Sequence, residues 1–250
     1  MAIQIKNIKI MNGIFITVRT GSTRLPNKSI LKIKDKYTIE YVINSVKKSK
    51  YADKVILCTT RNSEDDILCE IAEKNKIEFY RGSELNKFKR WVGAAEKFNI
   101  DFFVTADGDD LFYDVGLSDL CFEQIEDGDF IDGQGLYNDV YGMKTFTLKT
   151  ILSILDGKNI EPYDIVDFLK TTNLKVKKLE NVPKIYKKNN IRMTLDYQED
   201  FEFFSNVIEN IKFDFNIKDV LNYIQDNPYI VNINYKREQD WKNNQGKGNE

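Results

Sequence analysis

The chain of 250 residues carries 37 lysines and arginines against 39 aspartates and glutamates, a formal net charge of −2. This balance gives no support to nucleic acid or an anionic membrane as a partner, and no apolar run approaches the roughly 20 residues that a membrane-spanning helix needs. The chain also contains no histidine, which excludes Ser-His-Asp and Cys-His catalysis and histidine metal ligands. Any chemistry must therefore use carboxylates, lysine, arginine, tyrosine, backbone amides and hard metal ions.

The length suits a single α/β domain that buries enough apolar surface to need no disulfide or metal for its stability. Cys58, Cys69 and Cys121 are odd in number and widely spaced, a pattern typical of buried thiols in a reducing cytoplasm. The first residues lack the apolar core of a signal peptide. We therefore expect a cytoplasmic protein with one domain over residues 1–236.

Short apolar runs alternate with helical patterns in the first half of the chain. The runs predict buried strands, and the helical spacing between them predicts right-handed crossovers and a mostly parallel sheet. The strands are expected at 13–18, 55–59, 77–80 and 102–106, and the helices around 39–46, 63–71 and 88–95. Ligands of such sheets bind beyond the carboxyl ends of the strands, so chemistry is expected in the loops at 19–28 and 107–110.

The second half of the chain is less regular, and no repeat or linker marks a domain boundary. From Arg237 the sequence turns polar and rich in Gly, Asn and Lys, which predicts a disordered tail over 237–250. At the other end two interpretations stay open: Met11 is the effective start of the fold, or residues 1–10 add an edge strand. The patterns between predict helices near 147–156, 162–170, 198–210 and 217–226, and strands at 174–179 and 191–195.

A cationic turn directly follows the first predicted strand. Arg19, Arg24 and Lys28 supply three fixed positive charges, and Gly21 lets the backbone come close to a ligand. This combination suits a polyphosphate, which binds backbone amides and charge-assisted donors together. The turn is not a P-loop, because Asn27 stands where the glycine before the lysine is required. The alternative is a solvated basic loop, which the position behind a buried strand disfavours.

Aspartates gather after the fourth predicted strand, and Asp107 and Asp109 are among them. Their mutual repulsion requires a nearby cation, and oxygen ligands alone favour Mg²⁺ or Mn²⁺ holding phosphate oxygens. Asp-Gly clusters also form ordinary turns and helix N-caps, and the same alternative holds for Asp196, which lies between a predicted strand and a predicted helix. Arg90 is either a ligand-binding cation or a surface charge beside Trp91.

Residues 19–28 match the pattern Arg-x-Gly-Ser-x-Arg-Leu-Pro-x-Lys at each defining position. By this signature the chain resembles the sugar-acid cytidylyltransferases, the group of the acylneuraminate and 3-deoxy-manno-octulosonate (KDO) enzymes, and most closely the branch of spore coat polysaccharide biosynthesis protein F. The likeness covers residues 13–210. Looser similarities follow in the family's order at 52–60, 80–83, 90–95, 194–196 and 199–201.

The resemblance implies a nucleotide-diphospho-sugar transferase fold of the glycosyltransferase-A type and an Mg²⁺-dependent cytidylyltransferase, with Mn²⁺ as the alternative metal. Such enzymes couple CTP to a sugar acid, here a sialic-acid-like or KDO-like 3-deoxy-2-ulosonic acid. The products are a CMP-sugar for surface polysaccharide or glycan synthesis and pyrophosphate. By position, the resemblance implies that CTP is bound by Arg19, Gly21, Ser22, Arg24, Lys28 and Arg90.

The first metal ligand stays open between two aspartates. The family pattern Gly-Asp-x-Pro-Leu-x-Asp aligns with Asp109 and ends on Asp114, whereas the preceding Thr-Ala-Asp favours Asp107. We prefer Asp109. Asp196 matches the second metal ligand of the family, so the resemblance implies Lys28, Asp109 and Asp196 as the catalytic residues.

Three departures from the family pattern concern the sugar more than CTP. Leu111 replaces a proline, the arginine that usually precedes this motif is missing, and so is the sugar-site histidine of some members. Four cations are candidates for pairing with the carboxylate of the acceptor, namely Arg81, Arg90, Lys144 and Arg192.

Two other functions compete with cytidylyl transfer. A glycosyltransferase of the same fold would use residues 107–109 as its sugar-nucleotide metal motif, but its donor has no triphosphate for the loop at 19–28. The departures from the family pattern also allow a non-catalytic relative that binds a nucleotide. By analogy with the family we expect a homodimer, with no nucleic-acid or membrane partner.

Overall fold

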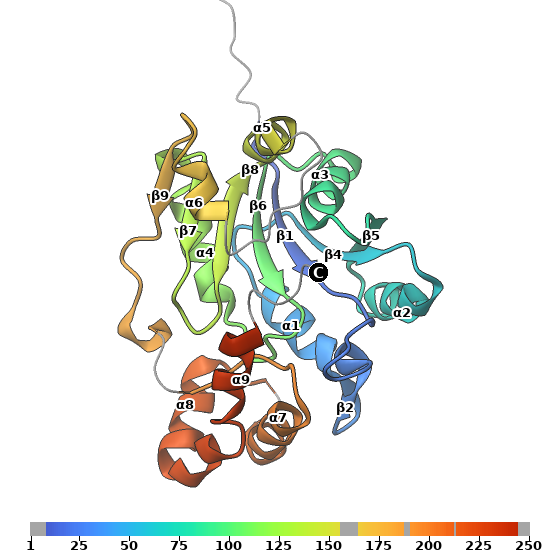
Figure 1. The fold of residues 1–250 in the computed structure, drawn as a ribbon, viewed down its shortest axis with the longest axis vertical. Coiled ribbons are helices and arrows are strands. Elements are labelled where there is room, and N and C mark those ends of the chain that lie inside the picture. Colours follow the sequence, from blue (N-terminus) through green and yellow to red (C-terminus); the bar gives the residue numbers. More distant parts are fainter. Residues whose placement is uncertain (1–8, 156–164, 188–190, 213, 245–250) are drawn as a thin grey trace, which may run out of the picture.

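A seven-stranded sheet runs through the middle of the molecule, in the order β5-β4-β1-β6-β8-β7-β9 (Figure 1). The structure, a computed structural model, describes residues 9–155, 165–187, 191–212 and 214–244. Strand β8 is antiparallel to its neighbours β6 and β7, and the other neighbouring pairs are parallel, so the mostly parallel sheet is confirmed. The strands are β1 (Asn12–Thr17), β4 (Lys54–Thr60), β5 (Glu78–Gly82), β6 (Phe102–Asp107), β7 (Phe130–Gly133), β8 (Val140–Lys144) and β9 (Val176–Lys178), besides a hairpin of β2 (Lys32–Ile33) and β3 (Lys36–Tyr37).

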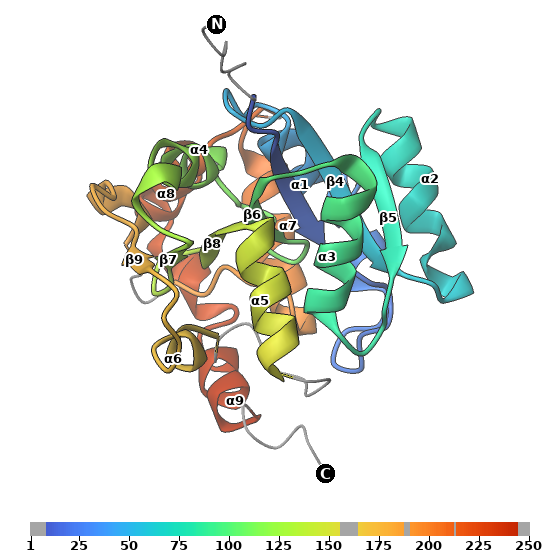
Figure 2. The same cartoon turned by 90° about the horizontal axis from the view of Figure 1, so that it is seen from above.

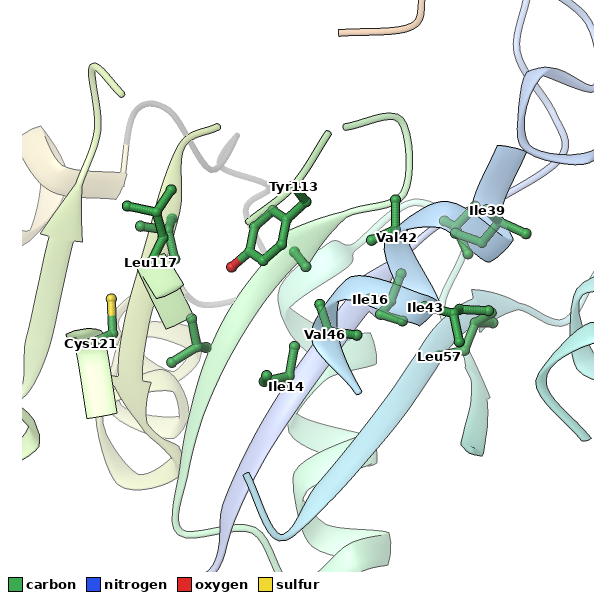
Figure 3. Close-up of a cluster of buried hydrophobic side chains, with 14 of the residues drawn as sticks. Ile14, Ile16, Ile39, Val42, Ile43, Val46, Leu57, Tyr113, Leu117 and Cys121 are labelled. Atoms are coloured by element: carbon green, nitrogen blue, oxygen red, sulfur yellow. The ribbon is translucent and has the colours of Figure 1, made fainter. Parts of the chain in front are cut away.

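Strand β1 is buried on both faces, because its side chains alternate between two layers of helices (Figure 2). Ile14 and Ile16 point to the layer of α1 (Thr38–Val46), α2 (Asp66–Lys74) and α4 (Val115–Glu123), as Figure 3 shows. Phe15 points to the layer of α3 (Lys87–Phe98), α5 (Thr145–Leu155) and α6 (Ile165–Leu169). It stacks there on Phe103 of β6, with 4.3 Å between the ring centres.

A third hydrophobic cluster lies beyond the carboxyl ends of the parallel strands. Figure 1 shows α7 (Gln198–Asn210), α8 (Ile217–Asp226) and α9 (Arg237–Asn244) gathered below the ends of β1 and β6. Phe112, from the loop after β6, packs on Phe204 and Phe203 with ring centres 4.6 and 6.1 Å apart. Leu25 of the cationic loop belongs to the same cluster, so the C-terminal helices are packed against both loops in which chemistry was expected.

Two of the predictions for the second half of the chain are wrong. The strand expected at 191–195 is wrong: the segment pairs with none of the described strands, and its buried Met193 and Leu195 pack into the third cluster instead. The disordered tail is wrong over residues 237–244, where α9 forms, because Arg237 pairs with Glu199 of α7 at 2.7 Å and with Asp240 one turn further on.

Some expectations fall outside the described residues. They concern residues 1–8 of the edge strand considered for residues 1–10, the beginning of the helix at 162–170, and the last residues of the tail, 245–250. Residues 9–11 are described and belong to no strand. None of the described helices is both long and apolar enough to cross a membrane.

Candidate active site

The loop after β1 is anchored by a buried aspartate. Asp65, just before α2, accepts hydrogen bonds from the Thr20 amide at 2.8 Å and the Thr20 hydroxyl at 2.7 Å. Its second oxygen accepts bonds from Thr59 and Thr60 at the end of β4. Burial alone would raise the pKa of Asp65, but these donors outweigh it and hold the pKa below its ordinary value of 3.8. Asp65 thus ties the start of the cationic loop to the neighbouring strand.

Lys28 lies between two carboxylates from distant segments. Its Nζ is 2.5 Å from Oδ2 of Asp109 and 2.9 Å from Oδ1 of Asp196. Burial lowers the pKa of Lys28, but the two negative charges outweigh it and leave the pKa above its ordinary value. Burial would raise the pKa of Asp196, whereas Lys28, Arg24 and Arg192 bring it below its ordinary value. Lys28 is therefore a cation and Asp196 an anion at neutral pH.

Asp107 and Asp109 are separated by a glycine that packs against β1. A Cβ on Gly108 would lie 2.7 Å from Cβ of Val18, so no larger residue fits without movement of the backbone. Asp107 pairs with Lys87 of α3 at 2.8 Å. Of the two candidate metal ligands, only Asp109 therefore shares a lysine with Asp196.

The segment before α7 is joined to the loop after β6 by two hydrogen bonds. The Leu195 amide donates to the carbonyl oxygen of Asp109 at 2.9 Å, and the Thr194 hydroxyl donates to Oδ1 of Asp110 at 3.1 Å. Burial, followed by the charge of Asp109, raises the pKa of Asp110 well above its ordinary value. These bonds bring Asp196 next to Asp109, although 87 positions separate the two in the sequence (196 − 109).

Three of the four cations considered for the acceptor carboxylate are paired within the protein. Because a guanidinium or amine already bound to a carboxylate has less charge to offer a ligand, these three are weaker candidates than the sequence allowed. The pairs are Arg81 with Asp66 at 2.5 Å, Lys144 with Asp129 at 3.4 Å, and Arg192 with Asp200 at 2.9 Å.

Arg90 is the exception among the four. Only 4% of it is exposed, its Nη1 donates to the carbonyl oxygen of Ser83 at 2.6 Å, and its Nε has no hydrogen-bond partner in the described part of the chain. Neither Arg90 nor the exposed Arg19 forms an ion pair with a described carboxylate. Burial, and to a smaller extent the charge of Arg19, lower the pKa of Arg90. The interpretation of Arg90 as a surface charge is therefore wrong.

The backbone at Gly21 borders open space. A Cβ at this position would meet no other atom within 4 Å, so the packing of the protein itself does not require glycine there. The neighbouring Ser22 hydroxyl accepts a long hydrogen bond of 3.5 Å from the Leu25 amide. The backbone at Gly21 thus leaves room for a ligand beside the cationic loop.

The site offers two hard oxygen ligands for a divalent cation. Asp109 and Asp196 already converge on one positive charge, the amine of Lys28. In the described ranges no three acidic, cysteine or histidine side chains cluster closely enough to hold a metal by themselves. Two carboxylates nevertheless fit Mg²⁺, which keeps several waters and binds substrate phosphates in addition to one or two protein ligands.

The profile of the cytidylyltransferase family matches residues 14–226. The chain belongs to this family. It is therefore a nucleotidyltransferase, and the nucleotide-diphospho-sugar transferase fold implied by the sequence is confirmed.

Individual relatives agree with this membership. The chain is 29% identical to an uncharacterized protein of Methanocaldococcus jannaschii, over 88% of this chain and 92% of that protein. It is 26% identical to spore coat polysaccharide biosynthesis protein SpsF of Bacillus subtilis, over 77% and 85% of the two chains. It is also similar to the solved structure of a cytidylyltransferase from Leptospira borgpetersenii serovar Hardjo-bovis, with 27% identity, a TM-score of 0.76, and coverage of 89% and 97%. The resemblance to the sugar-acid cytidylyltransferases is confirmed.

The sequence did not reveal three residues that shape this site. Asp65 was visible only as part of a helix start, Lys87 only as the residue before a helical stripe, and Asp200 only as part of a loose family similarity. Thr20 and Asp107 come from segments that only the fold brings to Asp65 and Lys87. Arg192 lies eight positions before Asp200 in the sequence.

Proposed function

We propose that the protein transfers the cytidylyl group of CTP to a hydroxyl group of a small sugar acid, giving a CMP-sugar and pyrophosphate. The acceptor class is a 3-deoxy-2-ulosonic acid of the sialic-acid or KDO type. The observation that carries the proposal is the position of Lys28, whose amine joins Asp109 and Asp196 at the end of the cationic loop. Family membership and the similarity to a spore coat polysaccharide protein support it.

The triphosphate of CTP would meet two kinds of cation. Arg24 and Lys28 contact Asp196 and lie beside the proposed metal ligands. Arg19 and Arg90 form no ion pair with a described residue, and a buried guanidinium without a counter-ion is costly unless a ligand supplies the negative charge. Close backbone and hydroxyl contacts would come from Gly21 and Ser22.

Asp109 and Asp196 are the proposed ligands of Mg²⁺ or Mn²⁺. Asp107 is the weaker choice, because its carboxylate faces Lys87 and not Lys28. Bound at this position, the metal would neutralise charge on the α-phosphate and lower the pKa of the acceptor hydroxyl.

The transfer is a single in-line displacement. The acceptor oxygen forms a bond to the α-phosphorus, the bond from this phosphorus to the bridging oxygen of the β-phosphate breaks, and pyrophosphate leaves with that electron pair. The hydroxyl proton passes to solvent. Lys28 stays protonated because its pKa is raised, so it offsets the charge that develops on the phosphates and does not act as a base.

Pyrophosphate release tests this function. The purified protein is incubated with Mg²⁺, each ribonucleoside triphosphate, and a panel of KDO, neuraminate, legionaminate, pseudaminate and polyol phosphates. We expect release with CTP and a sugar acid, and its loss in Lys28→Met. Lys149→Met is the matched control, because Lys149 is an exposed lysine that pairs with Glu96 far from the site.

Two results would replace the proposal by its alternatives. Binding of CTP in calorimetry, without turnover on any acceptor, would identify a non-catalytic relative. Transfer from a nucleotide-sugar, without pyrophosphate release from any triphosphate, would identify a glycosyltransferase.

A further inference from the structure

Asp196 divides its carboxylate oxygens between two sets of partners. Oδ1 is 2.7 Å from Arg24 and 2.9 Å from Lys28, on the side of the cationic loop. Oδ2 is 3.0 Å from Nη2 of Arg192, whose side chain is 4% exposed. A charge-assisted hydrogen bond of this kind is directional, so the contact with Arg192 restricts the rotation of the Asp196 carboxylate.

Arg192 is itself held by other carboxylates. Its Nε and Nη2 donate to the two oxygens of Asp200 at 2.9 and 3.2 Å, and its Nη1 is 3.2 Å from Oε2 of Glu238 in α9. Asp200 also accepts hydrogen bonds from the backbone amides of Asp196 and Tyr197, both at 2.9 Å. The guanidinium and the backbone of Asp196 therefore share one acceptor, which sets their relative positions.

The C-terminal segment completes this arrangement. Nδ2 of Asn234 donates to Oδ1 of Asp200 at 2.9 Å and to the carbonyl oxygen of Arg192 at 3.2 Å. Asn234 is 1% exposed, and Glu238 lies shortly after it in the chain, in α9. Residues from the end of the described chain thus hold a side chain that contacts the centre of the site.

We propose that Arg192 is a positioning residue, whose guanidinium holds Oδ2 of Asp196 so that Oδ1 is presented to the divalent cation and to Lys28. The inference rests on the proposed function, and it gives Arg192 a role in place of binding the acceptor. Partners that orient a metal ligand typically account for about 10- to 100-fold in metal affinity, because a ligand that rotates freely must be ordered when the metal binds.

The variant Arg192→Lys tests the inference, because it keeps the charge but lacks the planar fork of donors with which Arg192 binds Asp196 and both oxygens of Asp200. We would measure the affinity for Mn²⁺ in the presence of CTP by electron paramagnetic resonance, together with kcat, KM for CTP and thermal unfolding. The affinity for Mn²⁺ is expected to fall about tenfold or more, and kcat is expected to fall more than KM for CTP changes.

Arg237→Lys is the matched control. The guanidinium carbons of Arg237 and Arg192 lie 5.0 and 5.7 Å from the centre of the same Tyr197 ring. Arg237 pairs with Glu199 and Asp240, and it has no bond to Asp196. Its substitution is therefore expected to leave the affinity for Mn²⁺ unchanged, even where it lowers the unfolding temperature.

The outcomes separate this inference from the proposed function. A lower unfolding temperature of Arg192→Lys, with kcat and the affinity for Mn²⁺ unchanged, would show a purely structural arginine and overturn the inference alone. If Arg192→Lys does not fold, Glu238→Gln is tested in its place, because it weakens the contact with Nη1 of Arg192. An unchanged affinity for Mn²⁺ in Glu238→Gln would then overturn the inference. A wild-type protein that binds no Mn²⁺ with CTP would overturn the proposed function and the inference together.

Discussion

Asp107 and Asp109 stand one residue apart, yet their carboxylates bind lysines from different elements, Lys87 of α3 at 2.8 Å and Lys28 of the loop after β1 at 2.5 Å. The two residues look equivalent in the motif but have different surroundings in the fold. Only the lysine that binds Asp109 also binds Asp196.

The first prediction compares the conservative variants Asp109→Asn and Asp107→Asn. Asp109→Asn is expected to lower kcat for pyrophosphate release by about 100-fold or more, because it removes a charge at the point where the phosphates react. Asp107→Asn removes a carboxylate that faces α3, and a much smaller loss is expected. Steady-state kinetics of both variants measure these losses of kcat. Equal losses of kcat in the two variants would mean that the site does not distinguish the two aspartates.

The second prediction concerns Arg90→Met. Because a buried guanidinium without a carboxylate partner is unfavourable in the free protein, the variant is expected to unfold at a higher temperature than the wild type without ligand. It is also expected to lose most of the stabilisation that CTP gives to the wild type. Arg81→Met, at an arginine already paired with Asp66, serves as control and keeps the effect of CTP. A destabilised Arg90→Met protein that retains this effect would contradict the prediction.

The third prediction contrasts two glycines of the site. Gly108→Ala places a Cβ 2.7 Å from Cβ of Val18 and is expected to lower the free energy of unfolding by about 1–3 kcal/mol. The Cβ added in Gly21→Ala points into open space. The free energy of unfolding of this variant in urea is therefore expected to equal that of the wild type, while its KM for CTP is expected to rise. A destabilised Gly21→Ala protein would show that the loop needs this glycine for its own conformation.

The fourth prediction concerns pH and the anchor of the cationic loop. The pKa of Asp65 is lower in the folded protein than its ordinary 3.8, so its charged form stabilises the fold above that value and this contribution is lost as the pH falls through the folded-state pKa. Asp65→Asn is therefore expected to be less stable than the wild type by about 1–3 kcal/mol at neutral pH.

The same variant gives the pH test its control. The difference in free energy of unfolding between wild type and Asp65→Asn, measured by urea titration from about pH 7 to about pH 3, should shrink below the ordinary pKa. Asp66→Asn, at the exposed neighbour that pairs with Arg81, should show a small difference throughout. If the difference in free energy of unfolding between wild type and Asp65→Asn grew as the pH fell, the charged carboxylate would not have a stabilising role.

The fifth prediction is loss of activity on removal of divalent cations. EDTA is expected to abolish pyrophosphate release, and Mg²⁺ or Mn²⁺ to restore it. Ca²⁺ is expected to restore it poorly, because it prefers more ligands at longer distances than two carboxylates and a triphosphate give at this site. Full activity in EDTA, with residual metal measured in the same sample, would remove the metal role of Asp109 and Asp196.

Much of the first half of the fold could be predicted, because β1, β4 and β6 are formed by mostly apolar, buried runs. Strands β1, β4, β5 and β6 follow the expected ranges within a few residues. Strands β7 and β8 were missed, since β7 has only four residues and β8 carries Gly142 in its middle. The segment at 191–195 has the composition of a strand but uses the Leu195 amide to bind the loop after β6.

Lys28 and Asp109, which the sequence singled out by their motifs, lie in contact in the structure, and their roles in the reaction stay predictions. A role that depends on pairing is harder to predict from the sequence. The sequence left Arg90 and Arg192 equivalent as cations that could bind an acceptor. The fold separates them, because Arg192 meets Asp200 within the same segment, while Arg90 of α3 is buried against β5 without a described carboxylate. Such pairing is set by three-dimensional contacts that no local pattern contains.

The place of β1 in the sheet has a consequence for synthesis. As the nascent chain leaves the ribosome, this apolar strand emerges before the rest of its sheet, because its two neighbours, β4 and β6, end only at residues 60 and 107. Until then the edges of β1 are open to pairing with other chains, which favours aggregation. A chaperone would therefore matter most for this protein under conditions that slow translation of the segment between β1 and the end of β6.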